Sequence, residues 1–435
     1  MIPKKISAGR GTLLAIKTDK FKTEMLTLTL PLPMAQRTQR LCTLLFSILR
    51  RGCKAYPDIA SLSRRLDDLY DANIATMAAP TGENFSAGFA CECLDSAYVK
   101  EDNDLLAGTL DTLRKMLFEP LLDADGNFSQ KALELEKRNL CDSIRTSDND
   151  PKIHSFQLCR GIMFEGEPYG KRAAGTVEDV MAVNGKELEE FRREYLGLSS
   201  PTFIYIGRRD AEEIKALIEK YFGDFGGEKA RLNKTILKNA VPSMRSVEEE
   251  MSVLQGKLTL GMRSDIGAVD KDMYAAILTN DIFGGSPSSK LFRNVREKQS
   301  LCYSCSSSFD FVKGALFVRS GISNENKDRV IKEILAQFEE IKSGNISDYE
   351  FECSKRSIEN YYRQASDSAY SMENYYRTRS IAGIDTTLDG AIEAIHSVTK
   401  EDVVRAANRF GADTCAFVRG NLGDGKGYEE GDEDE

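Results

Sequence analysis

The chain repeats one order of predicted elements in its two halves, and this repeat is the feature that most limits its fold. Each half opens with strands, continues through a block of amphipathic helices and ends in a returning strand. At 435 residues the chain is also too long for one ordinary hydrophobic core. We therefore expect an α+β protein with two similar domains, residues 1–225 and 248–423, joined by a linker at 226–247 that shows no periodicity.

The apolar pattern locates the individual elements. In the first half, strands are expected at residues 12–17, 24–30, 74–79, 84–93 and 202–207, and helices at 36–51, after the cap Asp58, at 102–117, 129–146, after Pro151, at 185–195 and at 211–222. In the second half, strands are expected at 253–262, 301–311, 315–321 and 414–418, and helices at 271–283, 290–297, 327–341, 348–365, 369–382 and 400–410. Pro31 and Pro33 should end the second strand, because proline donates no ladder hydrogen bond. The Gly- and acid-rich tail, 424–435, is expected to be disordered.

The richest local pattern is the corner between residues 280 and 303. An apolar helix runs into Gly284 and Gly285, which are expected to supply a positive φ, and Pro287 cannot continue the helix. A short helix then leads into an extended run. Arg296 and Tyr303 lie seven residues apart across this corner, so their side chains can converge on one spot.

Within this corner, residues 291–303 read Leu-Phe-x-x-Val-Arg-Glu-Lys-x-x-Leu-x-Tyr. This resembles the second-domain signature of the insulinase, pitrilysin and mitochondrial-processing-peptidase family of zinc peptidases. The resemblance extends along most of the chain through Pro168-Tyr169-Gly170, Gly175-Thr176, Ile206-Gly207 and Tyr221-Phe222-Gly223. It implies two similar α+β domains closed like a clam shell. It also implies that Arg296 and Tyr303 bind the peptide carbonyl at the metal, with Gly284 and Gly285 shaping the corner.

The same resemblance shows which half of the machinery is missing. The family carries an inverted His-x-x-Glu-His on its first long helix, with the Glu as general base. Counted back from Gly52, these positions hold Thr43, Phe46 and Ser47, none of which can do that work. The third ligand position falls at Asp142 or Ser143. We expect a degenerate zinc motif and no metal in this chain, with zinc in a partner.

No other catalytic pattern replaces the zinc site. The chain has two histidines, His154 and His396, expected one in each domain and each without a His or Cys at helical spacing. A Ser or Cys hydrolase would need a histidine beside its nucleophile. Residues 284–290 superficially resemble a phosphate loop, but Pro287 removes one N–H. The pair Cys302 and Cys305 lies in a predicted strand, where an offset of three should send the thiols to opposite faces. A zinc ribbon or redox site is therefore not expected.

Composition limits the partners and the compartment. The net charge is −9 and the Lys and Arg residues are scattered, which gives no footprint for nucleic acid. The sequence shows neither a signal peptide nor an apolar run long enough to span a membrane. We therefore expect a cytoplasmic protein whose ten cysteines are thiols.

Some bacterial members of the family divide the enzyme between two chains, one with the zinc motif and one with the Arg–Tyr pair. The sequence resembles the second kind. We expect a pseudo-peptidase that is inactive alone and completes the site of a related zinc-bearing subunit, or forms a homodimer in its absence, on a peptide substrate. The alternative is a structural or peptide-binding scaffold of the same fold with no role in catalysis. An independent hydrolase with an unrecognised site is a third reading.

Overall fold

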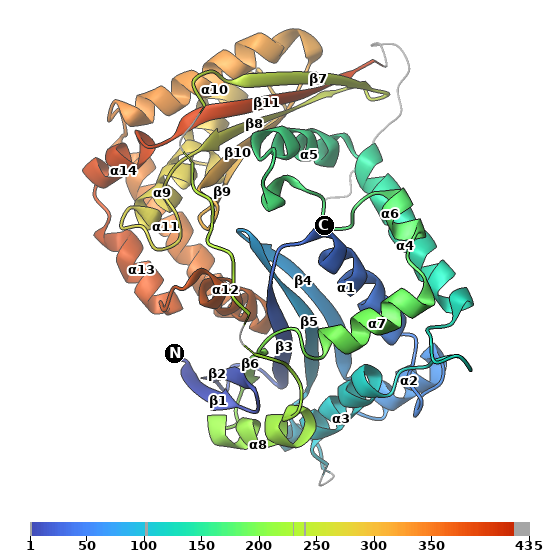
Figure 1. Ribbon diagram of the computed structural model, residues 1–435. Coiled ribbons are helices and arrows are strands. Elements are labelled where there is room, and N and C mark those ends of the chain that lie inside the picture. The colour runs from blue at the N-terminus through green and yellow to red at the C-terminus, as the bar shows by residue number, and fades with distance from the viewer. Residues whose placement is uncertain (1, 101–102, 229, 239–240, 422–435) are drawn as a thin grey trace. The chain divides into compact units, whose positions relative to one another are not determined.

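The computed structural model describes residues 2–100, 103–228, 230–238 and 241–421, which form two compact units (Figure 1). Unit 1 contains the described residues of Met1–Arg145, Glu167–Ile236 and Tyr361–Ile392. Unit 2 contains those of Thr146–Gly166, Leu237–Asn360 and Glu393–Glu435. The two-domain α+β fold expected from the sequence is confirmed. The units differ from the expected contiguous domains because two segments are exchanged between the halves. The expected acidic tail lies outside the described residues.

Unit 1 is built on a six-stranded sheet in the order β1-β2-β6-β3-β5-β4. Its strands are β1 (Lys4–Ala8), β2 (Gly11–Lys17), β3 (Thr23–Pro33), β4 (Asn73–Thr81), β5 (Asn84–Leu94) and β6 (Thr202–Gly207). Neighbouring strands are antiparallel except β2 and β6, which are parallel. Alternation along β3 separates the two faces of the sheet. Leu26, Leu28 and Leu30 enter the hydrophobic core, whereas the Thr27 hydroxyl donates to Glu373 on the other face.

Helices cover both faces of this sheet. Unit 1 contains α1 (Gln36–Leu49), α2 (Ile59–Asp67), α3 (Leu105–Phe118), most of α4 (Gln130–Asn149), α6 (Val177–Met181), α7 (Gly185–Tyr195), α8 (Ala211–Phe222) and α12 (Ala369–Ala382), with short turns η1 (Ser96–Tyr98) and η2 (Pro168–Gly170). The core lies between the sheet and α1, α3 and α7. Helix α12, from the second half of the chain, packs against β3, β4 and β6. Its Glu373 is fully buried and pairs with Arg377.

Unit 2 is built on a five-stranded sheet in the order β7-β11-β8-β10-β9. Its strands are β7 (Arg245–Met251), β8 (Gly256–Arg263), β9 (Ser304–Asp310), β10 (Ala315–Ile322) and β11 (Gly411–Gly420). Its helices are α5 (Pro151–Met163), α9 (Met273–Asn280), α10 (Lys327–Lys342), most of α11 (Asp348–Ala365), α14 (Lys400–Ala407) and part of α13 (Leu388–Ser397), with the short turn η5 (Asn324–Asn326). Two π-helical segments, η3 (Asp281–Gly285) and η4 (Leu291–Lys298), connect α9 to the edge strand β9.

Helix α5 comes from the first half of the chain but packs on the second sheet, beside β8 and β11 (Figure 1). The Ser155 and Thr259 hydroxyls are 2.9 Å apart, and the Phe156 and Phe317 ring centroids are 4.9 Å apart. Gly261 permits this approach, because a Cβ there would lie 2.5 Å from the sulfur of Met163. This helix therefore moves His154, expected in the first domain, into unit 2.

Most predicted elements are present, and the exceptions have local causes. Strands β1 and β7 and helices α6 and α13 were not predicted. Strand β7 carries charged, exposed residues because it is an edge strand paired only with β11. Pro31 does not end β3, which continues to Pro33. Strand β6 pairs with Met25–Thr29 of β3 and ends before the prolines. The missing N–H groups of Pro31 and Pro33 therefore interrupt no hydrogen bond to β6. Across the described stretches of the chain, no helix is long and apolar enough to cross a membrane.

Candidate functional site

The corner that carries Arg296 and Tyr303 is fixed first by Gly284. A Cβ at this position would lie 2.7 Å from Cδ1 of Leu291 and 2.9 Å from the backbone N of Ser307. Only glycine therefore lets η3 contact β9 this closely. The Ser307 hydroxyl lies 2.8 Å from Oδ1 of Asn280 and holds the two segments together. Gly284 and Gly285 do shape the corner, but the expected positive φ is absent from both, since their role is to leave space.

Buried side chains on one side of η4 fix its position. Leu291 and Val295 are fully buried, and the buried Lys290 pairs with Glu350 of α11 at 3.1 Å. The Asn294 amide donates to Gln337 of α10 at 2.6 Å. These contacts set the rotation of η4 and direct its opposite side, which includes Arg296, to solvent.

The exit from η4 is equally fixed. Ser300 adopts the left-handed conformation, with a φ of 49°. The Leu301 N–H donates to the Val295 carbonyl at 3.1 Å, and the Tyr303 N–H donates to the Gly321 carbonyl of β10 at 3.0 Å. The backbone next to both candidate residues is therefore tied to buried structure.

The two side chains themselves are exposed. Arg296 has 42% of its side chain exposed, and its guanidinium lies 4.7 Å from the centroid of the Phe292 ring. Tyr303 is 68% exposed, so it is not a core aromatic. The structure thus places two exposed hydrogen-bond donors at the two ends of one anchored turn, and the Arg296 guanidinium also lies 3.8 Å from the Glu297 carboxylate.

An open cavity of about 740 Å³ adjoins this turn. Pro287, Phe292 and Tyr349 supply apolar surface, and Arg293 and Lys298 supply positive charge. The Arg293 guanidinium lies 5.3 Å from the centroid of the Tyr349 ring. The surface beside Arg296 can therefore contact an extended chain through both apolar and charged groups.

Behind the cavity lies a carboxyl group that the sequence did not single out. Asp281 is 8% exposed and accepts a hydrogen bond from the Ser357 hydroxyl at 3.1 Å. Burial raises the pKa of Asp281 above its ordinary value of 3.8. A single aspartate between an apolar helix and two glycines forms no recognisable sequence motif. Its burial becomes evident only in the structure, where it bonds to Ser357 of α11.

Cys302 and Cys305 also differ from the sequence expectation. Strand β9 begins at Ser304, after a bend at Tyr303, so strand alternation does not extend over both cysteines. The expectation that their thiols face opposite sides of one strand therefore does not apply. The Cys305 thiol lowers the pKa of Cys302 to about 7, aided by the Ser320 hydroxyl and the charge of Arg296 against the effect of burial. The same contact and burial raise the pKa of Cys305 well above its ordinary value.

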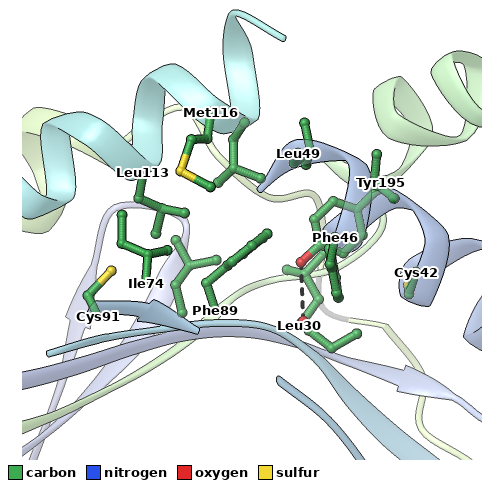
Figure 2. Close-up of a cluster of buried hydrophobic side chains, with 14 of the residues drawn as sticks. Leu30, Cys42, Phe46, Leu49, Ile74, Phe89, Cys91, Leu113, Met116 and Tyr195 are labelled. Atoms are coloured by element: carbon green, nitrogen blue, oxygen red, sulfur yellow. Dashed lines mark hydrogen bonds between the residues drawn. The ribbon is translucent and has the colours of Figure 1, made fainter. Parts of the chain in front are cut away.

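The positions of the degenerate zinc motif lie on α1, within unit 1. Figure 2 shows Phe46 among the buried side chains of this unit, near Phe89 and Tyr195. Phe46 is 1% exposed, and its ring centroid is 4.8 Å from that of Phe89. Thr43 donates its hydroxyl to the Gln39 carbonyl of its own helix at 3.0 Å, and Ser47 is half-buried. An aromatic ring thus fills the position where the family resemblance would place a general base.

The remaining candidate ligands are dispersed. Asp142 is exposed and pairs with Arg145 at 2.9 Å, and Ser143 is exposed on α4. His154 contacts Glu249 at 2.7 Å, and His396 contacts Glu359 at 2.8 Å, both in unit 2. Within the described ranges, no three His, Cys, Asp or Glu side chains gather as a metal site would require.

Comparison with known proteins decides the family. The chain is 30% identical over 417 residues to the probable inactive metalloprotease YmfF of Bacillus subtilis, covering 95% of this chain and 97% of that protein. The family model described as the peptidase M16 inactive domain matches residues 182–358. The chain belongs to the M16 peptidase family.

Two further proteins are similar to this chain over most of its length. The uncharacterized zinc protease YmxG of Bacillus subtilis is 24% identical over 373 residues, which cover 83% of this chain and 88% of that protein. A crystal structure of a conserved protein from Enterococcus faecalis has a TM-score of 0.88 and 25% identity, and covers 97% of this chain and 99% of that one. The inactive-domain match covers residues 182–358 and therefore does not include α1.

Proposed function

We propose that this M16 chain is the zinc-less subunit of a two-chain zinc endopeptidase. In this assembly the partner supplies the metal and the general base, and this chain supplies Arg296 and Tyr303 to bind the scissile peptide carbonyl. We also propose that it works in the cytoplasm, which is consistent with ten cysteines that are all free thiols.

The observation that carries the proposal is the contrast between anchored backbone and exposed side chains at residues 296 and 303. Tyr303 is 68% exposed although both neighbours on its N-terminal side, Leu301 and Cys302, are buried. A large aromatic side chain that is this exposed has no packing role in the chain itself. A role in binding accounts for both exposures at once.

The chemistry of the two groups fits the negative charge that develops on a carbonyl oxygen during peptide hydrolysis. The guanidinium of Arg296 can donate several hydrogen bonds in a planar array. The hydroxyl of Tyr303 adds one more donor. Such donors stabilise the transition state more than the bound substrate, and therefore raise kcat.

A partner of the right kind is suggested by the relatives. Bacillus subtilis contains both a probable inactive metalloprotease and an uncharacterized zinc protease that resemble this chain. We infer that the partner here is likewise a related M16 chain with an intact His-x-x-Glu-His. Where no such chain exists, a homodimer takes its place and the scaffold reading becomes the better one.

The test mixes this chain with a zinc-motif-bearing M16 chain of the same organism and measures cleavage of a quenched fluorescent peptide. We expect chelator-sensitive cleavage by the mixture and none by this chain alone. Arg296→Ala should lower kcat of the mixture by about 10- to 1,000-fold, the range for a single oxyanion donor. Arg296→Lys should not restore it, because an ammonium lacks the planar array of donors.

The matched control is Arg329→Ala, which removes another exposed arginine of unit 2, on α10. It should leave kcat and assembly unchanged. If the mixture is no more active than the zinc-bearing chain alone, while the two chains still associate in size-exclusion chromatography, this chain is a scaffold.

A further inference from the structure

The open cavity of about 740 Å³ next to η4 has a lining of uneven charge. Arg293 and Lys298 each contribute a positive charge to the lining, and Glu297 contributes a negative one. The Glu297 carboxylate is already engaged in part, because it lies 3.8 Å from the Arg296 guanidinium. The lining is therefore net positive, although the chain as a whole has a net charge of −9.

The fold leaves the charges of both cavity cations unpaired. Arg293 and Lys298 are exposed, and among the described residues no carboxylate forms an ion pair with either of them. The buried Lys290, three residues before Arg293, instead pairs with Glu350 at 3.1 Å. The ion pair of this region thus neutralises the cation that folding buries, and the two cations at the cavity keep their charge available to a ligand.

Aromatic and apolar groups accompany these charges. The Arg293 guanidinium lies 5.3 Å from the ring centroid of Tyr349, which is itself 60% exposed. A guanidinium over an aromatic ring keeps the N–H groups at its edge available for two parallel hydrogen bonds to a carboxylate. Pro287 and Phe292 add apolar surface to the lining. A carboxylate at the end of a short apolar stem therefore matches both the charge and the apolar part of the cavity.

We propose that this cavity is a specificity subsite that binds an aspartate or glutamate side chain of the peptide substrate. Its place in catalysis rests on the proposed function. Glu297 of the lining follows Arg296 directly in η4, so the acidic residue lies close to the peptide bond whose carbonyl Arg296 binds. Arg293 and Lys298 determine specificity and do not touch the reacting atoms. A basic side chain at the same place would meet two unpaired cations and is therefore disfavoured.

The first experiment measures binding by this chain alone and does not depend on catalysis. Fluorescence anisotropy compares a fluorescein-labelled peptide of alanine and serine with central glutamates against the same peptide with glutamines. We expect the glutamate peptide to bind about three- to tenfold more tightly at low salt, as ion pairs that stay partly exposed would give. High salt should weaken this preference, because it screens such pairs. Equal affinities, or no binding of the glutamate peptide, would overturn the subsite.

Charge variants locate the preference in the cavity. Arg293→Ala and Lys298→Ala should each reduce it, and Arg293→Glu combined with Lys298→Glu should reverse it in favour of a peptide with lysines. The matched control combines Arg329→Glu with Lys332→Glu, which makes the same charge change at exposed residues of α10. This control should keep the preference for glutamate. Circular dichroism checks that every variant is folded. An equal loss of preference in the control would show that only overall charge attracts the peptide, and would overturn the subsite.

The second experiment separates the subsite from the proposed function. The two-chain mixture is given quenched fluorescent peptides that carry Glu or Gln at successive positions of one host sequence. At one position Glu should raise kcat/KM about three- to tenfold over Gln, and Arg293→Ala should remove this gain without lowering kcat/KM for the Gln peptide.

The two possible failures are distinguishable. Cleavage that is indifferent to the acidic residue, with kcat still dependent on Arg296, would overturn the subsite and leave the proposed function standing. An inactive mixture, in which this chain alone still prefers the glutamate peptide, would overturn the proposed function and leave the cavity as a binding site for acidic peptides.

Discussion

The ring of Phe46 meets the ring of Tyr195 edge to face, with centroids 5.4 Å apart and planes at 71°. Tyr195 in turn donates its hydroxyl to the Ala87 carbonyl at 3.2 Å, so the pair is tied to the sheet. Edge-to-face contacts of this kind add to the apolar area that the rings bury. Phe46, the position where the sequence resemblance would place a general base, is therefore part of the hydrophobic core.

The first prediction follows from that burial. Phe46→Glu removes the aromatic packing and buries an unpaired carboxylate, and should lower the free energy of unfolding by about 3–5 kcal/mol at neutral pH. Denaturant unfolding followed by circular dichroism measures this. Ser47→Glu, one residue along on the half-buried side of α1, should cost much less. Equal free energies of unfolding for the Phe46→Glu and unsubstituted chains would show that position 46 is exposed to water.

The second prediction concerns metal. The purified chain should contain no stoichiometric zinc, because Thr43 and Ser47 offer hydroxyl groups that are poor zinc ligands and no cluster of stronger ligands lies in the described residues. Elemental analysis after dialysis against buffer with added zinc measures the content. One zinc ion per chain, together with chelator-sensitive cleavage by this chain alone, would contradict the assignment as an inactive subunit.

The third prediction tests the glycine at the corner. Gly284→Ala places a Cβ 2.9 Å from the backbone N of Ser307, so η3 and β9 must move apart. The expected loss is about 1–3 kcal/mol of unfolding free energy, typical of overpacking. Gly161→Ala on α5 is the control, because a Cβ there meets no atom within 4 Å. It should be neutral or slightly stabilising, and equal effects of both substitutions would refute the close contact.

The fourth prediction is a pH dependence. Burial raises the pKa of Asp281 in the folded chain above its ordinary value of 3.8, so the unfolded chain loses that proton first as pH rises. Asp281 therefore removes stability as pH rises from its unfolded pKa to its folded pKa. Asp281→Asn should gain stability relative to the unsubstituted chain over that window and show no relative change below it. A constant difference from pH 3 to pH 7, measured by denaturant unfolding, would show that this carboxyl is not perturbed.

Local patterns explain which parts of the fold were predictable. The alternation of Leu26, Leu28 and Leu30 marks β3, since period two places them on one face. Asp58 caps α2 in a capping box with Ser61, and Gly383 closes α12 in the left-handed conformation, as their types suggest. These signals depend only on neighbours in sequence.

What could not be predicted depends on contacts between distant residues. No local pattern predicts that α5 packs on the second sheet, because that packing depends on the contact between Phe156 and the distant Phe317. The thiols of Cys302 and Cys305 were assigned to opposite faces because the strand was expected to start at residue 301. The bend at Tyr303, where the backbone N–H bonds to Gly321, delays the strand to Ser304, so strand alternation does not extend over both cysteines.

The central claim is that Tyr303 donates a hydrogen bond in the active site of a partner, and Tyr303→Phe tests it most directly. This change deletes one hydroxyl and keeps the ring, so fold and assembly should be unaffected. The measurement is kcat of the two-chain mixture under saturating peptide, with Tyr370→Phe, another tyrosine that is 65% exposed, as the matched control. We predict a fall of about 10- to 1,000-fold for Tyr303→Phe and none for Tyr370→Phe. Full activity of a folded, assembled Tyr303→Phe mixture would contradict the account.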